Sequence, residues 1–481
     1  NIGKYYHGNL MERAQILVFA LCGHMGKKGS GFSAFPFLTQ DGFEVFGFAK
    51  RAGWVGKLGL AAQAWSMLHQ LKKPGMTDEM VRYELGNLQF REGVMVSGVM
   101  FWNIHGGLLE VSGRSQEWDP YLKRPVAAYL AEALERGYQY VWPKPGRDPR
   151  IIFEYGSNIL RRLRGYQFVQ KTLFPKLKAF VTIDWRMTST ALFSDYVLPA
   201  AGWYEKNEHK WGTPLMPYLH AGTKAVSFYE AKSDWEICAL LAKAIQERAR
   251  ARGVTAFADR HGNQRQIDTV YDDFTMAGVY AEGDDEKVAA ELVAASSNLT
   301  GVDWQQLKQK GYARFTGIGR SGVSIGNACE IKADDTVSPF AFHVEKKEPY
   351  PTLTRRIQFY IDHPFYLELG ETLPVHKDSP KAGGDYPLTL TGGHTRWSIH
   401  AAWRDDARML RLQRGRPAMY MSIADAQARG IEDGDLVEVR NDIDSFRIHA
   451  KLSPSVRPGQ LIIYHAWENY QFPGGKGFQN L

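Results

Sequence analysis

The 481-residue sequence is poor in cysteine: it contains only Cys22, Cys238 and Cys329, which lie far apart. Their odd number and wide spacing exclude a disulfide framework, a cysteine zinc site and an iron–sulfur cluster held by this chain alone. We interpret them as three buried thiols.

Long hydrophobic runs are also lacking. The longest apolar stretches, residues 16–22 and 93–102, are shorter than the roughly 20 residues that a bilayer crossing needs. No signal peptide is recognisable, but the chain begins with Asn1 rather than Met. We therefore expect it to be part of a longer protein.

Charge of one sign is scarce too. With 59 Lys and Arg against 52 Asp and Glu, the net charge is only +7. The basic cluster of Arg161, Arg162 and Arg164 is local, and no basic run alternates with aromatics, so we expect no nucleic-acid partner. The 44% hydrophobic and 13% aromatic residues instead indicate a globular protein with large pockets.

The middle of the chain has a strand–helix–strand pattern. Residues 151–155 and 179–183 are short apolar strands, and residues 159–171 between them have helical periodicity. This order predicts a right-handed parallel α/β unit. Ligands bind outside the carboxyl ends of such strands, so residues 156–158 and 184–190 are expected on one binding edge.

Two helices and a strand-rich C-terminal region complete the pattern. We predict helices at residues 11–21 and 234–246, the first of which runs into a glycine-rich loop at Gly23–Gly31. The C-terminal region alternates strands with turns, which predicts a small β-barrel. Its expected strands are residues 388–390, 420–421, 436–440, 446–451 and 460–464.

Two segments carry a family resemblance. Residues 182–199 read TIDWRMTSTALFSDYVLP, and residues 392–400 read GGHTRWSIH. Together with residues 464–468, YHAWE, they resemble the molybdopterin oxidoreductases of the dimethyl sulfoxide reductase family. The combination is specific, although each piece alone is weak.

The resemblance implies a cofactor and a position within a larger subunit. The family binds molybdenum between two molybdopterin guanine dinucleotides. This chain resembles the C-terminal half of a catalytic alpha subunit, whose absent N-terminal portion supplies a 4Fe-4S cluster and the protein ligand to molybdenum. The expected division is a catalytic α/β region (1–140), a Rossmann-like dinucleotide-binding region (141–250), a mixed α+β subdomain (251–385) and a C-terminal β-barrel that binds molybdopterin dinucleotide (386–481).

The resemblance assigns a first group of residues to the cofactor: Gly156, Ser157, Asn158, Asp184, Trp185 and Arg186. The residue types agree with this role. Gly156 permits close backbone approach, and Ser157 offers a donor for a phosphate or ribose. Asp184 can accept two hydrogen bonds from the guanine edge, and Arg186 can offset pyrophosphate charge or stack on a base. The alternative is an ordinary α/β turn with a helix cap.

A second group follows two C-terminal strands: Gly393, His394, Thr395, Arg396, Trp397, Ser398, His400 and His465. To it we add Gln479 and Asn480, which follow the glycine-rich turn at residues 474–477. Together these side chains offer many polar groups and aromatic planes, which suit the polar rim and flat face of a pterin. His394 and His400 are close enough in sequence to form a metal pair, but no carboxylate or cysteine lies within ligand spacing, so we assign no metal. For His465, an ordinary buried histidine at a strand end is the alternative.

The loop Gly23–Gly31 resembles the family segment that contacts the other dinucleotide. We assign a catalytic role to Lys27, with Lys28 as its alternative, because a desolvated ammonium can stabilise an oxygen anion at the metal. A solvated loop lysine is the competing interpretation. His105, next to two glycines, is a weaker candidate.

Within the family, the sequence resembles one subgroup, which includes the nitrate, selenate, chlorate and dimethyl sulfide enzymes and the anaerobic hydrocarbon hydroxylases. Within that subgroup it looks most similar to ethylbenzene and steroid C25 dehydrogenases. The aromatic stretches at residues 32–37, 42–48, 54–65 and 95–104 suit a hydrophobic tunnel, although core packing explains them equally. We therefore expect a hydroxylase that adds water-derived oxygen to a hydrocarbon or sterol C–H bond. An oxyanion reductase and a metal-free scaffold subunit are the alternatives.

Partners and compartment follow from the resemblance alone. We expect an iron–sulfur beta subunit and a haem b gamma subunit, and a hydrophobic small-molecule substrate. The expected compartment is the periplasm, with the cytoplasm as the alternative.

Overall fold

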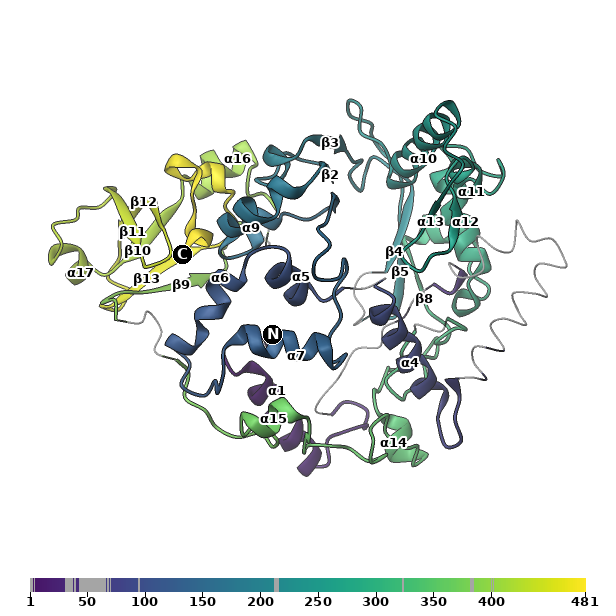
Figure 1. Ribbon diagram of the computed structural model, residues 1–481, viewed down its shortest axis with the longest axis horizontal. Helices are drawn as coiled ribbons and strands as arrows, with labels where there is room; N and C mark the ends of the chain where they lie inside the picture. The colour runs from purple at the N-terminus through teal and green to yellow at the C-terminus, as the bar shows by residue number, and fades with distance from the viewer. Residues whose placement is uncertain are drawn as a thin grey trace.

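The computed structural model describes residues 3, 5–30, 38, 40–42, 66, 69, 71–93, 96–211, 216–321, 324–380, 385–398, 400 and 402–481. The described chain curves in an arc (Figure 1). The C-terminal sheet lies at the left, a small parallel sheet near the centre, and a helix-covered antiparallel sheet at the right. Among the described helices, none combines the length and the apolar composition that a bilayer crossing requires.

Helices dominate the N-terminal region. They are α1 (Gly8–Leu21), α4 (Asp78–Arg91), α5 (Gly98–Ile104), α6 (Leu109–Ser112), the 3-10 turn η2 (Gly113–Glu117) and α7 (Val126–Glu135). The helix predicted at residues 11–21 is thus present and starts earlier. Arg13 of α1 donates to the backbone carbonyls of Phe359, Glu371 and Thr372, which ties this helix to the segment beside α15 (Pro364–Glu368).

The predicted parallel unit is confirmed. Its elements are β1 (Ile151–Tyr155), α8 (Ile159–Arg162), α9 (Tyr166–Thr172), η3 (Phe174–Lys176), β2 (Ala179–Asp184), η4 (Ala191–Phe193) and β3 (Tyr196–Pro199). Both strand pairs are parallel, in the order β1-β2-β3. The single helix predicted at residues 159–171 is wrong, because the backbone is extended at Leu163 and left-handed at Gly165, where φ is +70°, and this separates α8 from α9.

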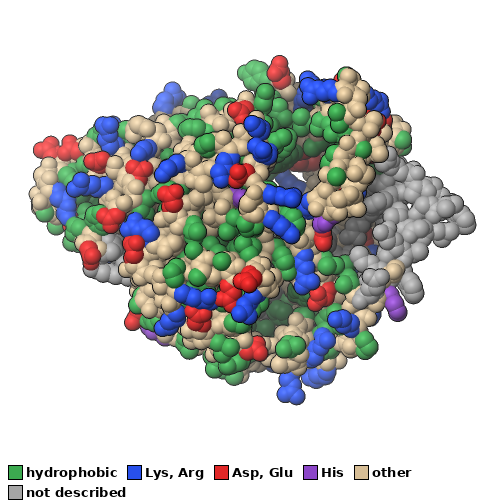
Figure 2. Space-filling view, viewed as in Figure 1, with side chains coloured by type: hydrophobic (Ala, Val, Ile, Leu, Met, Phe, Trp, Pro, Cys, Tyr) green, Lys and Arg blue, Asp and Glu red, His purple; other side chains and the backbone are tan. Residues whose placement is uncertain are grey.

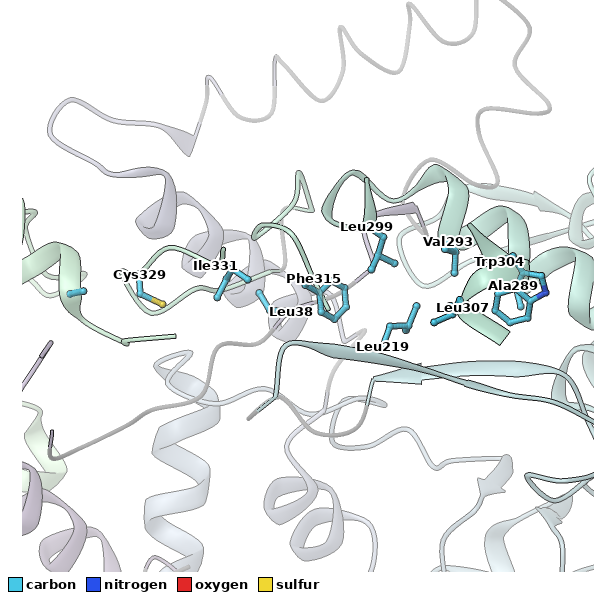
Figure 3. Close-up of a cluster of buried hydrophobic side chains, with 11 residues drawn as sticks. Leu38, Leu219, Ala289, Val293, Leu299, Trp304, Leu307, Phe315, Cys329 and Ile331 are labelled. Atoms are coloured by element: carbon cyan, nitrogen blue, oxygen red, sulfur yellow. The ribbon is translucent and has the colours of Figure 1, made fainter. Parts of the chain in front are cut away.

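The middle region packs helices on a three-stranded antiparallel sheet of order β4-β5-β8. Its elements are β4 (Glu208–Trp211), β5 (Tyr218–Gly222), α10 (Asp234–Ala251), β6 (Ala256–Ala258), β7 (Gln264–Gln266), α11 (Val270–Phe274), α12 (Asp285–Ala295), η5 (Ser297–Leu299), α13 (Trp304–Lys310), β8 (Tyr312–Arg314) and α14 (Ala341–Glu345). Leu219 from β5 meets Val293 from α12 and Leu307 from α13 in a buried apolar cluster (Figure 3). Burial of these side chains holds the helices against the sheet.

The C-terminal region is a five-stranded mixed sheet of order β11-β12-β10-β13-β9. Its elements are β9 (Thr389–Gly393), α16 (Ala407–Met409), the π-turn η6 (Leu410–Arg414), β10 (Ala418–Met421), α17 (Ile423–Gln427), β11 (Leu436–Arg440), β12 (Ser445–Leu452), β13 (Gln460–Tyr464), η7 (Asn469–Gln471), η8 (Pro473–Gly475) and η9 (Phe478–Asn480). The five predicted strands are therefore present.

The predicted closed barrel is not found in the described part of the chain. Closure requires the two edge strands to pair, and here β9 and β11 are edges with no pairing recorded between them. One face is instead sealed by side chains: Ile448 and Ile463 from the strands pack with Trp467 and Phe472 from the segment after β13. This covering lets the sheet stay open.

Candidate functional site

Two loops meet at the carboxyl edge of the parallel sheet, as the sequence predicts. Tyr155 at the end of β1 lies opposite Ile183 of β2, and the Gly156 N–H donates to the Ile183 carbonyl at 3.0 Å. Gly156 is exposed and has a φ of +56°, a conformation that favours glycine. The loop after β1 is thereby held beside the loop that begins at Asp184.

Asp184 and Trp185 form a carboxylate next to an aromatic plane. Burial raises the pKa of the Asp184 carboxyl, partly offset by the backbone N–H of Trp185, which donates to Oδ1 at 2.7 Å. Trp185 is 48% exposed, and its ring centroid lies 5.5 Å from that of the 56% exposed Trp203. An exposed aromatic surface beside a hydrogen-bond acceptor suits a planar base with N–H donors.

Asn158 differs from what its predicted contact with cofactor requires. It is 6% exposed. Its amide nitrogen donates to both carboxylate oxygens of Glu468, and its amide oxygen accepts from the hydroxyl of Thr190. Because protein groups already use both ends of this amide, the structure gives Asn158 a positioning role.

Glu154 lies beneath the same loop, near the end of β1. Its side chain is 3% exposed, and Oε2 has no hydrogen-bond partner among the described residues. Burial raises the pKa of this carboxyl from 4.5 to about 7, although the Ile159 N–H opposes the shift by donating to Oε1. Glu154 is therefore the group of this edge that titrates near neutral pH.

The second predicted group gathers at the ends of β9 and β13. These strands are parallel, with Gly393 opposite Tyr464, and the His465 N–H donates to the Gly393 carbonyl at 2.9 Å. A Cβ at Gly393 would lie 3.1 Å from the Tyr464 ring, so glycine allows this close approach. The pairing places the loop that starts at His394 directly beside His465.

Three imidazoles converge in these two loops. The ring centroid of His394 lies 4.3 Å from that of His465 and 5.3 Å from that of His400, and the third separation is 5.8 Å. Burial, followed by the charges of His394, Arg161 and His400, lowers the pKa of His465 to about 4. His465 is therefore neutral near pH 7. Its Nε2 is buried with no hydrogen-bond partner among the described residues.

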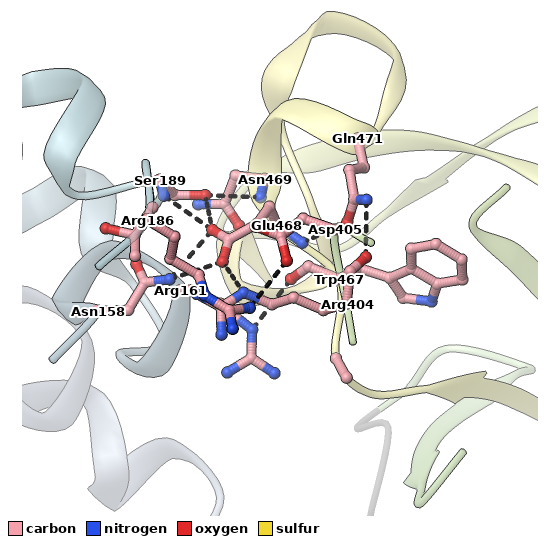
Figure 4. Close-up of polar contacts among 12 residues, drawn as sticks. Asn158, Arg161, Arg186, Ser189, Arg404, Asp405, Trp467, Glu468, Asn469 and Gln471 are labelled. Atoms are coloured by element: carbon pink, nitrogen blue, oxygen red, sulfur yellow. Dashed lines mark hydrogen bonds and ion pairs between the residues drawn. The ribbon is translucent and has the colours of Figure 1, made fainter. Parts of the chain in front are cut away.

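The buried carboxylate of Glu468 joins the two groups of loops (Figure 4). It is fully buried, forms an ion pair with Arg404, and accepts from Asn158 and from both the N–H and the hydroxyl of Ser189. A second link between the two regions is the ion pair of Arg186 with Asp405 at 2.8 Å. The network fixes the strand ends of the parallel sheet relative to those of the C-terminal sheet.

Three arginines, Arg161, Arg404 and Arg414, bind Glu468 or its neighbours Trp467 and Ala466. Burial and the neighbouring Arg404 lower the pKa of Arg161, and burial and Arg161 lower the pKa of Arg414 to about 10. Nε and Nη1 of Arg414 are buried without hydrogen-bond partners among the described residues, while Nη2 donates to the Ala466 carbonyl. Concentrated positive charge with unused donors suits an anionic ligand. On the face shown in Figure 2, several Lys and Arg side chains border a hollow just to the right of the centre of the molecule.

The remaining predicted residues are dispersed. Gln479 and Asn480 are 5% and 1% exposed, and they anchor the chain end on α9 through backbone carbonyls that accept from Gly165 and Gln167. Their side-chain oxygens have no hydrogen-bond partner among the described residues.

In the loop after β9, polar side chains differ in exposure. Arg396 and Trp397 are exposed and Thr395 is half-buried. Ser398 is buried and donates to the carbonyls of His400 and Ala402. Exposed and half-buried side chains of this loop are the ones able to reach a bound molecule.

The lysine predicted to be catalytic is not desolvated. Lys27 is exposed, and Lys28 forms an exposed ion pair with Asp335 at 2.7 Å. His105 is buried, with Nε2 2.7 Å from the Pro143 carbonyl, which accounts for it as a core histidine. A catalytic role for Lys27 stays a prediction without a supporting contact among the described residues.

Sequence reasoning assigned no role to the residues that join the two regions, namely the charged Arg161, Arg404 and Glu468 and the neutral Ser189. Glu468 lies in the quoted YHAWE segment, and its position directly after a buried Trp at a strand end was the available signal. Nothing in the local pattern around Arg404 indicates burial. These groups are recognisable only when residues some 300 positions apart in the chain are brought together.

Comparison with known proteins finds two family models that match this chain. Residues 4–244 match the family model described as molybdopterin oxidoreductase, and residues 388–478 match the model described as molydopterin dinucleotide binding domain. The respiratory nitrate reductase subunit alpha of Haloferax mediterranei is 33% identical over 500 residues, covering 100% of this chain and 45% of that protein.

Two further relatives are similar over nearly the whole chain. The dimethylsulfide dehydrogenase subunit alpha of Rhodovulum sulfidophilum is 30% identical over 98% of this chain and 47% of that protein. The chlorate reductase subunit alpha of Ideonella dechloratans is also 30% identical, over 98% of this chain and 47% of that protein. The chain therefore spans slightly less than half the length of these curated relatives.

Proposed function

The chain belongs to the molybdopterin oxidoreductase family, and from this membership we propose that it is the part of a molybdenum-containing alpha subunit that holds the guanine dinucleotide cofactor. The family resemblance predicted from the sequence is thereby confirmed. The observation that carries the proposal is the joining of the two predicted cofactor loops through Glu468.

The residues present fit such a cofactor. Asp184 can accept hydrogen bonds from a guanine base that stacks on the exposed Trp185. The buried Nε and Nη1 of Arg414, which have no hydrogen-bond partner in the described part of the chain, can donate to anionic oxygens. His465 offers a buried Nε2 that has no hydrogen-bond partner among the described residues. When bound, the cofactor supplies two-electron oxygen-atom transfer at molybdenum. The residues of this chain bind and orient it.

For the substrate, we propose a small oxyanion such as nitrate or chlorate. Two similar proteins are named for these substrates, which supports the proposal. The hydrocarbon hydroxylase predicted from the sequence is the second candidate. Its support is the four aromatic stretches. Outside the described residues lie residues 32–37, most of 42–48, residues 54–65 and one residue of 95–104.

A substrate panel on the native subunit complex separates these candidates. With reduced viologen as the electron donor, we expect turnover of nitrate or chlorate, and with a dye acceptor little oxidation of ethylbenzene, a sterol or dimethyl sulfide. Oxidation of a hydrocarbon with no oxyanion reduction would overturn the oxyanion proposal in favour of the hydroxylase. Oxidation of dimethyl sulfide alone would contradict both.

We further propose that the chain works inside a larger assembly. The similar proteins are named as alpha subunits and are about twice as long as this chain. This proposal requires an N-terminal portion that carries a 4Fe-4S cluster, an iron–sulfur beta subunit and a haem b gamma subunit. We propose the periplasm as the compartment of the whole assembly.

A further inference from the structure

Three histidines present their ring nitrogens to one point. One ring nitrogen from each of His394, His400 and His465 can be chosen so that the three nitrogens lie within 4.8 Å of one another. The cluster combines two loops that are held side by side by the parallel pairing of β9 and β13. Such convergence from separate loops is set by the fold.

The backbone maintains this arrangement. His400 has a φ of +50°, which turns its loop back toward His394, and the Ser398 hydroxyl holds the turn by donating to the His400 carbonyl at 3.2 Å. The His465 N–H donates to the Gly393 carbonyl. A left-handed non-glycine residue persists only where its surroundings enforce it.

Ligand chemistry narrows what this cluster can bind. Zinc is bound by histidine nitrogens at about 2.0–2.1 Å in tetrahedral geometry, which sets two nitrogens on one ion roughly 3.3 Å apart. Nitrogens separated by the 4.8 Å limit would therefore have to move inward. His394 and His400 are exposed and have room to rotate. A Thr395 N–H approaches Nδ1 of His465 at 3.5 Å, the outer limit of a hydrogen bond, so that contact is weak.

We propose that the cofactor-free chain binds a divalent transition metal, Zn²⁺ foremost, through His394, His400 and His465. Imidazole ligands suit Zn²⁺, Cu²⁺ and Ni²⁺ and disfavour Mg²⁺ and Ca²⁺. The positive charge of Arg161 acts on His465 and favours an anion, such as hydroxide or chloride, as the fourth ligand. The metal and the molybdenum cofactor exclude one another, because both use the same imidazoles; this part rests on the proposed function.

Cobalt absorption and zinc equilibrium dialysis on the cofactor-free full chain test the site. We expect one equivalent of Co²⁺ to give the visible bands of a tetrahedral complex that Zn²⁺ then abolishes. His394→Gln and His400→Gln each weaken Zn²⁺ binding at least about 10-fold, and neither exposed substitution affects folding. The control is His376→Gln, an exposed histidine outside the cluster, which leaves Zn²⁺ affinity unchanged.

The outcomes separate the two parts of the proposal. If the wild-type chain binds Zn²⁺ no more tightly than a variant lacking all three histidines, the metal site is wrong, whatever the function. If the cofactor-free chain binds Zn²⁺ and the cofactor-loaded protein binds it equally well, the shared use of the imidazoles is wrong. Binding by the cofactor-free chain alone supports both parts.

Discussion

Glu468→Gln is expected to lower the free energy of unfolding by about 3–5 kcal/mol, the cost of breaking a buried ion pair by removing one partner. The Glu468 side chain is fully buried and that of Arg404 is 5% exposed, so solvent cannot replace the lost charge. A glutamine of the same shape also brings an amide that donates where Asn158 and Ser189 need an acceptor. Urea denaturation followed by tryptophan fluorescence measures the loss.

Glu438→Gln is the matched control, because Glu438 is an exposed carboxylate on β11 of the C-terminal sheet. It is expected to change stability by less than about 0.5 kcal/mol. Combining Glu468→Gln with Arg404→Met should cost less than the sum of the two single changes. If Glu468→Gln is as mild as the control, the buried carboxylate does not join the two regions.

Glu154→Gln is expected to stabilise the protein above neutral pH. The unfolded carboxyl has its ordinary pKa of 4.5, and the folded value is raised to about 7 by burial. Between these values the native state retains a proton that the unfolded state has released, so stability falls as pH rises. Below pH 4.5 both states are protonated and the effect is absent; above about pH 7 it is complete.

Denaturation curves at pH 5 and pH 8 measure this effect. Relative to wild type, the Glu154→Gln variant should gain on the order of 2–3 kcal/mol of stability at pH 8 compared with pH 5. Glu110→Gln, at an exposed carboxylate of α6, should show no such pH-dependent gain. An equal pH dependence in wild type and Glu154→Gln would mean that Glu154 is ionised in the folded protein like an exposed carboxyl.

Local pattern was sufficient for the elements that position the site. The apolar strands around residues 151–155 and 179–183 pair in parallel as predicted, and the two loops at their ends meet on one edge. The helix between them could not be placed correctly, because the local sequence does not show that the backbone is extended at Leu163 and left-handed at Gly165. Closure of the C-terminal sheet depends on long-range pairing that strand patterns do not encode.

The candidate site was predictable as a list of residues but not as an arrangement. The family resemblance named His394, His400 and His465, and only the pairing of β9 with β13 shows that their rings converge. Conversely, Asn158 is a residue type that often contacts ligands, but here its amide nitrogen donates to Glu468 and its amide oxygen accepts from Thr190. Which partner a polar side chain takes is decided by packing between distant segments.

Analysis of molybdenum and released GMP in the purified native complex tests the central claim most directly. We expect about one molybdenum and about two GMP per alpha subunit, with the hard chemistry carried by this cofactor. Replacing Asp184 by Ala should lower the GMP content, since a charged acceptor for the guanine edge is removed. Neither molybdenum nor GMP in the wild-type complex would contradict the account and leave the chain as a scaffold that has kept the fold without the cofactor.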